Sequence, residues 1–323
     1  MKKLITLILV LAVISTVVFA AGGGQQSGAG YPSRPVTIIV PFGPGGGTDV
    51  LVRTIMRYLD LGGQSVVAVN IEGAAGFVGS MDAANRPADG YTILCQAIPD
   101  MLAYTLSGVT NRPLFDELVP ICVIASDYDM VSTNAQSGFR NVQDLVAFAR
   151  ANPGQIRWGT TGTRTPNAVN SMWMAEDLGI ADLITFVPYD GGAQARPALL
   201  GNHIQMLTGA TGDIFPHVQA GEVTPLMVIN DQRIGILPDT PTTLESGANA
   251  VQFVARSFWA PRGTPREVIS ILEAALKRVS ENPAFVADLR NLGIDVRFID
   301  SAAMHTLIRN WHSQLEPRFA RLQ

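Results

Sequence analysis

The sequence has few of the residues on which enzymatic and metal chemistry usually depends. It contains two cysteines and four histidines, and the histidines (His203, His217, His305 and His312) are scattered along the chain. Cysteines without close spacing form no zinc site. Neither the GxSxG pattern of hydrolases nor the HExxH pattern of metalloproteases occurs. The sequence therefore predicts no catalytic residues, no metal site and no cofactor.

Positive charge is also sparse. The 323 residues include 23 Lys and Arg against 27 Asp and Glu, so the formal net charge is -4, and no basic block stands out. Nucleic-acid-binding proteins gather basic residues on one face, so this composition excludes a nucleic-acid partner. An anionic ligand must then be held by local geometry rather than by bulk charge.

Long apolar runs are absent after the first twenty residues. Lys2 and Lys3 precede the apolar segment 4–19, which is followed by Ala20 and Ala21. This order predicts a signal peptide at 1–20, cleaved near Ala20, followed by a flexible linker at 21–32 and export to the periplasm. The alternative is an uncleaved membrane anchor, because the run is nearly long enough to span a bilayer. No cysteine near the cut offers a site for lipid attachment.

The two cysteines, Cys95 and Cys122, lie in apolar, strand-like runs. An exported protein permits a disulfide between them. The alternative is two buried thiols that serve as small hydrophobic side chains. The sequence leaves this choice open.

Strand-like and helix-like segments alternate, which predicts an α/β fold with two α/β units. The apolar run "VTIIV" (36–40) suits a buried parallel strand, and the helix that follows should end at Gly62 and Gly63. A second unit begins near residue 123. Extended runs near Ala125 and Phe253 should connect the units, and a last helix should cover 302–319.

A glycine-rich turn, "VPFGPGGGTDV", follows the first predicted strand and opens a helix. It lacks the lysine of a phosphate loop and the glycine spacing of a dinucleotide site. Backbone N–H groups at a helix start can still hold a carboxylate, and glycine permits its close approach. Thr48 can cap the helix or donate a hydroxyl. Asp49 fits either contact with a ligand or local ordering of the turn.

The second unit repeats this arrangement in "WGTTGTRTPN" (158–167). Its threonines are short hydrogen-bond donors, and Arg164 offers a planar fork that can bind a carboxylate. The alternative is a helix cap with a solvated arginine. "MLTGATGD" (206–213) has the same strand-to-helix form.

Five segments together resemble the extracytoplasmic solute receptors of tripartite tricarboxylate transporters, also called Bug or TctC-type proteins. They are "YPSRPVTIIVPFGPGGGTDVLVR", "GAAGFVGS", "ADGYTIL", "VPYDGGAQA" and "PDTPTTLESG". The resemblance runs from about Pro32 to the C-terminus. It implies a two-lobed periplasmic binding protein fold of type II-like form, with the ligand cleft between lobes at 33–125 plus 255–323 and 126–254.

The resemblance also implies a function: capture of a small carboxylate and delivery to the large and small permease subunits of the transporter by a monomeric receptor. A receptor for a sensor kinase, or an enzyme that uses the same cleft, is the alternative. Carried onto this chain, the family's ligand contacts are Phe42, Gly46, Gly47, Thr48, Asp49, Thr160, Thr161, Gly162, Thr165 and Thr208.

This chain departs from the family pattern at three places. Arg164 stands where the family usually has a small residue, Thr208 and Gly209 where it often has an acid or amide, and the apolar residues 97–99 where it has a polar loop. An added arginine and a lost acid favour a more anionic ligand. The sequence thus predicts a di- or tricarboxylate, with Arg164 among its contacts.

Overall fold

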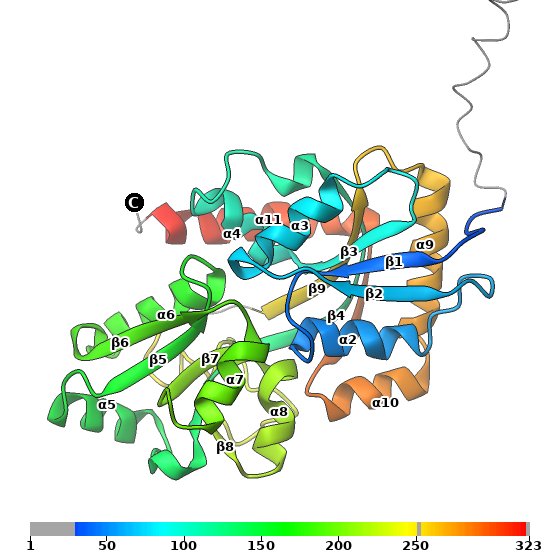
Figure 1. The fold of residues 1–323 in the computed structure, drawn as a ribbon. Coiled ribbons are helices and arrows are strands. Elements are labelled where there is room, and N and C mark those ends of the chain that lie inside the picture. The colour runs from blue at the N-terminus through cyan, green and yellow to red at the C-terminus, as the bar shows by residue number, and fades with distance from the viewer. Residues whose placement is uncertain (1–29, 251–252, 321–323) are drawn as a thin grey trace, which may run out of the picture. The chain divides into compact units, whose positions relative to one another are not determined.

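The computed structural model describes residues 30–250 and 253–320 (Figure 1). The predicted signal peptide at 1–20 and most of the linker at 21–32 lie outside the described residues. None of the helices in the described part of the chain is both long and apolar enough to span a bilayer.

The first α/β unit confirms the predicted alternation. β1, which is apolar except for Thr37, lies between β2 and β3, with both pairs parallel. Both faces of β1 are covered, which accounts for its buried valines and isoleucines. The elements of this unit are β1 (Val36–Val40), α2 (Gly47–Met56), β2 (Val66–Asn70), η1 (Ala74–Gly76), α3 (Phe77–Ala84), β3 (Thr92–Ala97), α4 (Ile98–Leu106) and η2 (Leu114–Asp116).

One local prediction in this unit is wrong. The first helix ends at Met56, well before Gly62 and Gly63. The segment after β3, where the family pattern has a polar loop, is helical, because α4 begins at Ile98. Pro99 lies in the first turn of α4, where a missing N–H costs nothing, since the first N–H groups of a helix have no partner within it.

The long strand β4 (Leu118–Asn134) connects the two sets of strands. Its first part, Leu118–Tyr128, pairs with β9, and its second part, from Asp129 onward, pairs with β7 and β8. The strands of the described residues are thereby linked into one sheet in the order β2-β1-β3-β9-β4-β7-β5-β6, with β8 and β10 paired to β4 outside this order. Side chains on β4 that stand near Asp129 therefore lie where the two sets of strands meet.

The second α/β unit also follows the predicted alternation. β5 lies between β6 and β7 in parallel pairs, and β8 runs antiparallel to β4. Its elements are η3 (Ala135–Ser137), α5 (Val142–Ala151), β5 (Ile156–Thr161), α6 (Pro166–Asp177), η4 (Ala181–Leu183), β6 (Ile184–Tyr189), α7 (Gly192–Leu200), β7 (Met206–Ala210), α8 (Thr211–Gln219) and β8 (Val223–Val228).

The chain then returns to the first unit. β9 (Phe253–Pro261) pairs with β3 and β4, and β10 (Asp295–Asp300) pairs with β4. Three helices complete the chain: α9 (Arg266–Ser280), α10 (Pro283–Asn291) and α11 (Ser301–Phe319). The rings of Tyr58, just after α2, and Phe285 of α10 pack edge to face, with their centroids 5.8 Å apart. Helix α10 therefore lies beside α2 (Figure 1). The last helix agrees with the predicted span.

Cys95 and Cys122 are both free and buried. Cys95 of β3 and Cys122 of β4 each pair in register with Phe258 of β9, so a whole strand separates them. Adjacent strands lie about 4.8 Å apart, which puts the two backbones about 10 Å from each other, too far for a disulfide. The cysteines are therefore buried thiols, and burial raises the pKa of the Cys95 thiol to about 12.

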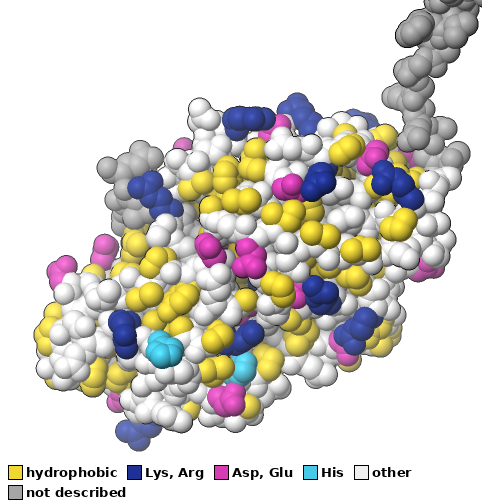
Figure 2. All heavy atoms as spheres, in the orientation of Figure 1, with side chains coloured by type: hydrophobic (Ala, Val, Ile, Leu, Met, Phe, Trp, Pro, Cys, Tyr) yellow, Lys and Arg dark blue, Asp and Glu magenta, His cyan; other side chains and the backbone are white. Residues whose placement is uncertain are grey.

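The surface mixes charges of both signs. Figure 2 shows Lys and Arg side chains standing apart from one another over the drawn face, with Asp and Glu between them. Several charges of the described residues form exposed ion pairs, such as Arg34 with Asp89 and Arg86 with Asp82.

Candidate functional site

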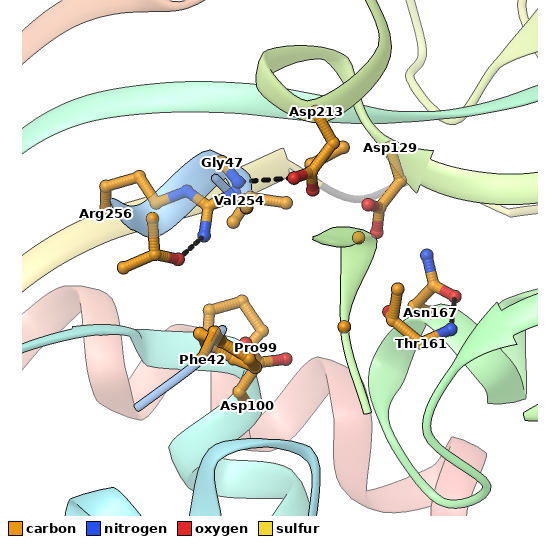
Figure 3. Close-up of a pocket in the computed structure, with 15 residues that line it drawn as sticks. Phe42, Gly47, Pro99, Asp100, Asp129, Thr161, Asn167, Asp213, Val254 and Arg256 are labelled. Carbon is orange, nitrogen blue, oxygen red and sulfur yellow. Dashed lines mark hydrogen bonds between the residues drawn. The ribbon is translucent and has the colours of Figure 1, made fainter. Parts of the chain in front are cut away.

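A narrow cavity of about 60 Å³ opens where the carboxyl ends of β1, β5 and β7 approach β9 (Figure 3). Loops after strands in an open α/β sheet commonly carry the binding residues. The residues that line the cavity come from the starts of α2, α4, α6, α7 and α8, from the loops before them, and from β4, β5, β7 and β9. They are Phe42, Gly46, Gly47, Thr48, Pro99, Asp100, Asp129, Thr161, Asn167, Gly191, Gly192, Ala210, Asp213, Val254 and Arg256.

The glycine turn after β1 is ordered from within. The N–H of Gly46 donates to the carbonyl of Gly43 at 3.2 Å. The Asp49 carboxylate accepts from the N–H of Gly45 at 2.9 Å and from Arg53 and Asn70. Burial opposes ionisation of Asp49, yet these hydrogen bonds hold its pKa below the ordinary value. Asp49 thus takes the local ordering role, and it does not line the cavity.

The start of α2 holds a carboxylate, and that carboxylate belongs to the protein. The N–H of Gly47 donates a short hydrogen bond to Asp213 Oδ1. A Cβ on Gly47 would lie 3.1–3.3 Å from the Asp213 carboxyl atoms, and one on Gly192, the first residue of α7, would collide with them. Asp213 therefore sits between two helix N-termini, where partial positive charge favours an anion. Glycine at both positions permits this close approach.

A buried ion pair forms the β9 wall of the cavity. Arg256, which is 5% exposed, donates from Nη1 to Thr48 Oγ1 and from Nη2 to Asp127 Oδ2, both at 2.8 Å. Burial alone would lower the pKa of the guanidinium, but the charge of Asp127 leaves it above the ordinary value. The ion pair thus leaves one donor atom, Arg256 Nε, and one acceptor atom, Asp127 Oδ1, without a hydrogen bond within the described residues.

Two further carboxyls face the cavity. Asp129 is 5% exposed, and its pKa rises to about 7 through burial and repulsion by Asp127 and Asp100, although Arg256 and a hydrogen bond from Asn167 oppose the rise. Burial raises the pKa of Asp100 to about 6. Burial also raises the pKa of Asp213, against the effects of Arg256 and the Gly47 N–H. The cavity is therefore lined by three carboxyl groups whose pKa values are raised above the ordinary value.

A second, larger cavity of about 370 Å³ is lined by residues of the loop before α6, of β6 and of η1, among others. Arg164 lies here, and its Nη1 donates to the carbonyl of Ser107 at 2.7 Å. Gly162 and Thr165 line the same cavity. Thr165 is the N-cap of α6, since its hydroxyl accepts from the N–H of Ala168.

The structure groups the sequence-predicted site residues into three sets. Phe42, Gly46, Gly47, Thr48 and Thr161 line the first cavity. Gly162, Arg164 and Thr165 line the second cavity. Asp49, Thr160 and Thr208 line neither.

The last two of these make internal bonds. The Thr160 hydroxyl donates to the carbonyl of Gly162, and the Thr208 hydroxyl lies 2.8 Å from both Trp158 Nε1 and Ser171 Oγ. Thr208 is fully buried.

Sequence reasoning missed five polar residues that line the first cavity, and the ion-pair partner of one of them. The lining residues are Asp100, Asp129, Asn167, Asp213 and Arg256, and Asp127 is the partner of Arg256. A signal for some of them was present. Asp127 and Asp129 alternate within an extended apolar run, and Arg256 interrupts another, so each pattern marks a charge on a buried strand that needs a partner. The acids form no metal-binding group: the described part of the chain holds no cluster of three or more His, Cys, Asp or Glu suited to a metal ion.

Comparison with known proteins identifies the family. The model of the tripartite tricarboxylate transporter family receptor, TctC, matches residues 54–318. The chain belongs to this receptor family. The resemblance drawn from the sequence motifs is thereby confirmed, and the family is one of binding proteins and not of enzymes.

Individual relatives agree with the family assignment. The receptor is 31% identical over 287 residues to a UPF0065 protein of Bordetella pertussis, with 87% of each chain covered. The solved structure of an R. palustris protein with adipate is 28% identical, with a TM-score of 0.82 over 89% of this chain and 97% of that one. The periplasmic binding protein BugD is 26% identical, with a TM-score of 0.82 over 90% and 97%. The predicted α/β periplasmic binding protein fold is confirmed.

Proposed function

We propose that this receptor captures a small carboxylate in the first cavity and delivers it to the large and small membrane subunits of a tripartite tricarboxylate transporter. The observation that carries the proposal is the cavity itself. It joins the glycine turn after β1, the turn after β5 and the start of α8 to Arg256, a buried arginine with a spare donor. A few convergent polar groups in a concave site are typical of solute binding.

The two sets of strands would act as lobes, with limits at 33–125 plus 255–323 and at 126–254. β4 and β9 are the segments that cross between these limits. Contacts join the proposed lobes across the cavity: Asp213 bonds to Gly47, and Arg196 Nη1 donates to the carbonyl of Gly45 at 3.2 Å. Hinge motion about the two crossing strands would open and close the site.

The receptor would act outside the cytoplasmic membrane as a monomer. Membership of a periplasmic binding protein family supports this location, and the sequence pattern at 1–20 supports export with a cleaved signal peptide. Delivery to a transporter is favoured over signalling through a sensor kinase because the matching family is defined by its transporter.

The size and charge of the solute depend on which of the two cavities it reaches. A relative carries adipate, which is a dicarboxylate and supports a carboxylate ligand. The di- or tricarboxylate predicted from the sequence relies on Arg164, whose guanidinium lines the second cavity and bonds to Ser107. A solute would need to reach both cavities to meet Arg164 and Arg256 together.

A thermal-shift screen tests the function. The purified receptor is heated with mono-, di- and tricarboxylates and with amino carboxylates, each in excess. A bound solute at a hundred times its Kd stabilises the folded state by about 2.7 kcal/mol. For a chain of this size we expect a rise in Tm of roughly 5 °C. If no member of any class raises the Tm, the proposed function fails.

A further inference from the structure

The side chain of Phe42 reaches from one proposed lobe to the other. A Cβ on Gly76, at the end of η1, would lie 2.9 Å from Phe42 Cζ, and a Cβ on Gly191, just before α7, would lie 3.4 Å from Phe42 Cδ1. The backbone is fixed by Asn70, whose Nδ2 donates to the carbonyl of Phe42 at 2.9 Å. The ring thus lies between the two glycines, which leave room for it because they have no side chain.

The two cavities meet at this ring. Phe42 and Gly191 line the first cavity. Ala75, which precedes Gly76, and Asp190, which precedes Gly191, line the second cavity. The N–H of Ala75 donates to Asp190 Oδ1 in a long hydrogen bond of 3.5 Å. The ring of Phe42 therefore stands where the first cavity ends and the second begins.

The wall beside the ring is held from both lobes. The Tyr104 hydroxyl donates to the carbonyl of Ala75, and Gln96 Nε2 donates to the Tyr104 hydroxyl, both at 2.9 Å. A Cβ on Gly162 would lie 2.9 Å from the Cβ of Ala75, so the turn before α6 lies against η1. A closely packed wall of this kind leaves the ring little room to move aside.

The first cavity has room only for a short solute. The contact of Arg196 with the carbonyl of Gly45 closes the two sets of strands on it. A water molecule needs about 10–15 Å³ of cavity volume, so the cavity of about 60 Å³ holds roughly four to six heavy atoms. Because a carboxylate group takes three of these atoms, the solute that fits has about two to four carbons in all.

We propose that the Phe42 ring sets the length of the solute, so that the receptor selects monocarboxylates of about two to four carbons and rejects longer chains. The proposal rests on the receptor function given above and narrows its ligand class. A longer chain would have to displace the ring to reach the second cavity and Arg164. The inference departs from the di- or tricarboxylate that the sequence predicted.

Calorimetric titration with carboxylates of increasing length tests the limit. The short probes are acetate, propionate, lactate and butyrate, and the long probes are hexanoate and adipate. We expect the tightest probe to be a short one, with both long probes at least about tenfold weaker, because forcing extra carbons into a packed site costs about 1–3 kcal/mol.

The outcomes separate this inference from the receptor function. A long probe that binds within tenfold of the tightest short probe overturns the inference and leaves the receptor function intact. The same holds if only a larger solute of the thermal-shift screen binds. If nothing in that screen binds, both fail.

Removal of the ring locates the limit. Phe42→Ala should join the two cavities and raise the ratio of hexanoate to propionate affinity at least about tenfold, because the added methylenes become buried at about 0.8 kcal/mol each. Phe42→Leu should raise the same ratio and serves as a second variant if Phe42→Ala fails to fold. The matched control is Phe148→Ala, since Phe148 is a partly buried residue of α5 that lines neither cavity, and it should leave the ratio unchanged. An unchanged ratio in a folded Phe42 variant contradicts the proposal.

A double variant tests where the longer chain lies. In Phe42→Ala the far carboxylate of adipate should enter the second cavity, which Arg164 lines. Adding Arg164→Ala should therefore lower the ratio of adipate to hexanoate affinity by about fivefold or more, as loss of a charged hydrogen bond implies. Both ligands are titrated at one salt concentration, because salt screens exposed charges. If this ratio does not change, the ring does not separate the first cavity from the second, and the proposal fails.

Discussion

Replacing Arg256 by methionine should lower the free energy of unfolding by about 3–5 kcal/mol, because the change leaves the fully buried Asp127 carboxylate without its counter-charge. Methionine preserves much of the side-chain volume, so the loss reports charge rather than a cavity. Chemical denaturation at neutral pH, with the midpoint and slope fitted together, measures it.

Two controls define the result. The double variant Asp127→Leu, Arg256→Met removes both charges and should recover most of the loss, as replacement of a whole buried pair often does. Arg86→Ala breaks an exposed pair with Asp82 and should cost less than about 1 kcal/mol. If Arg256→Met lowers the free energy of unfolding by no more than Arg86→Ala does, the Arg256–Asp127 pair does not stabilise the contact between β4 and β9.

Gly46→Val should weaken solute binding by at least about 100-fold, or about 2.7 kcal/mol. Gly46 has φ -75° and ψ 163°, which valine adopts without strain. A Cβ there would lie 3.3 Å from the carbonyl oxygen of Gly43 and 3.6–3.7 Å from the N and Cβ atoms of Ala193 at the start of α7. The two added methyl groups would hold the glycine turn away from α7 and enter the cavity that Gly46 lines.

The matched control is Gly235→Val, since a Cβ at this exposed glycine would meet nothing within 4 Å. Titration calorimetry compares both variants with the wild type, and their Tm values without solute check folding. We expect the control to bind as the wild type does. Retained affinity in a folded Gly46→Val protein would show that the turn after β1 plays only a structural role.

Local patterns predicted much of the fold. The apolar run of β1, the glycine turn before α2 and the alternation through α8 are visible because period and turn chemistry act over a few residues. The start of α4 at Ile98 was missed because a proline beside an apolar residue has the same local appearance in a loop and in a first helical turn.

The site was harder to predict because its charges meet only in the folded chain. Thr48 and Arg256 are 208 residues apart in the sequence and form a hydrogen bond. Gly47 and Asp213 are 166 residues apart and also form one. That the glycine turn binds a ligand carboxylate stays a prediction. The carboxylate that accepts from the N–H of Gly47 belongs to Asp213, on a helix from the other set of strands. Periodicity along one segment carries no information about such partners.

A crystal structure of the receptor with the solute that gives the largest thermal shift tests the central claim most directly. We expect density for the solute in the first cavity, between the glycine turn of Gly46–Thr48 and Thr161. Density confined to the second cavity beside Arg164 would contradict this account of the site.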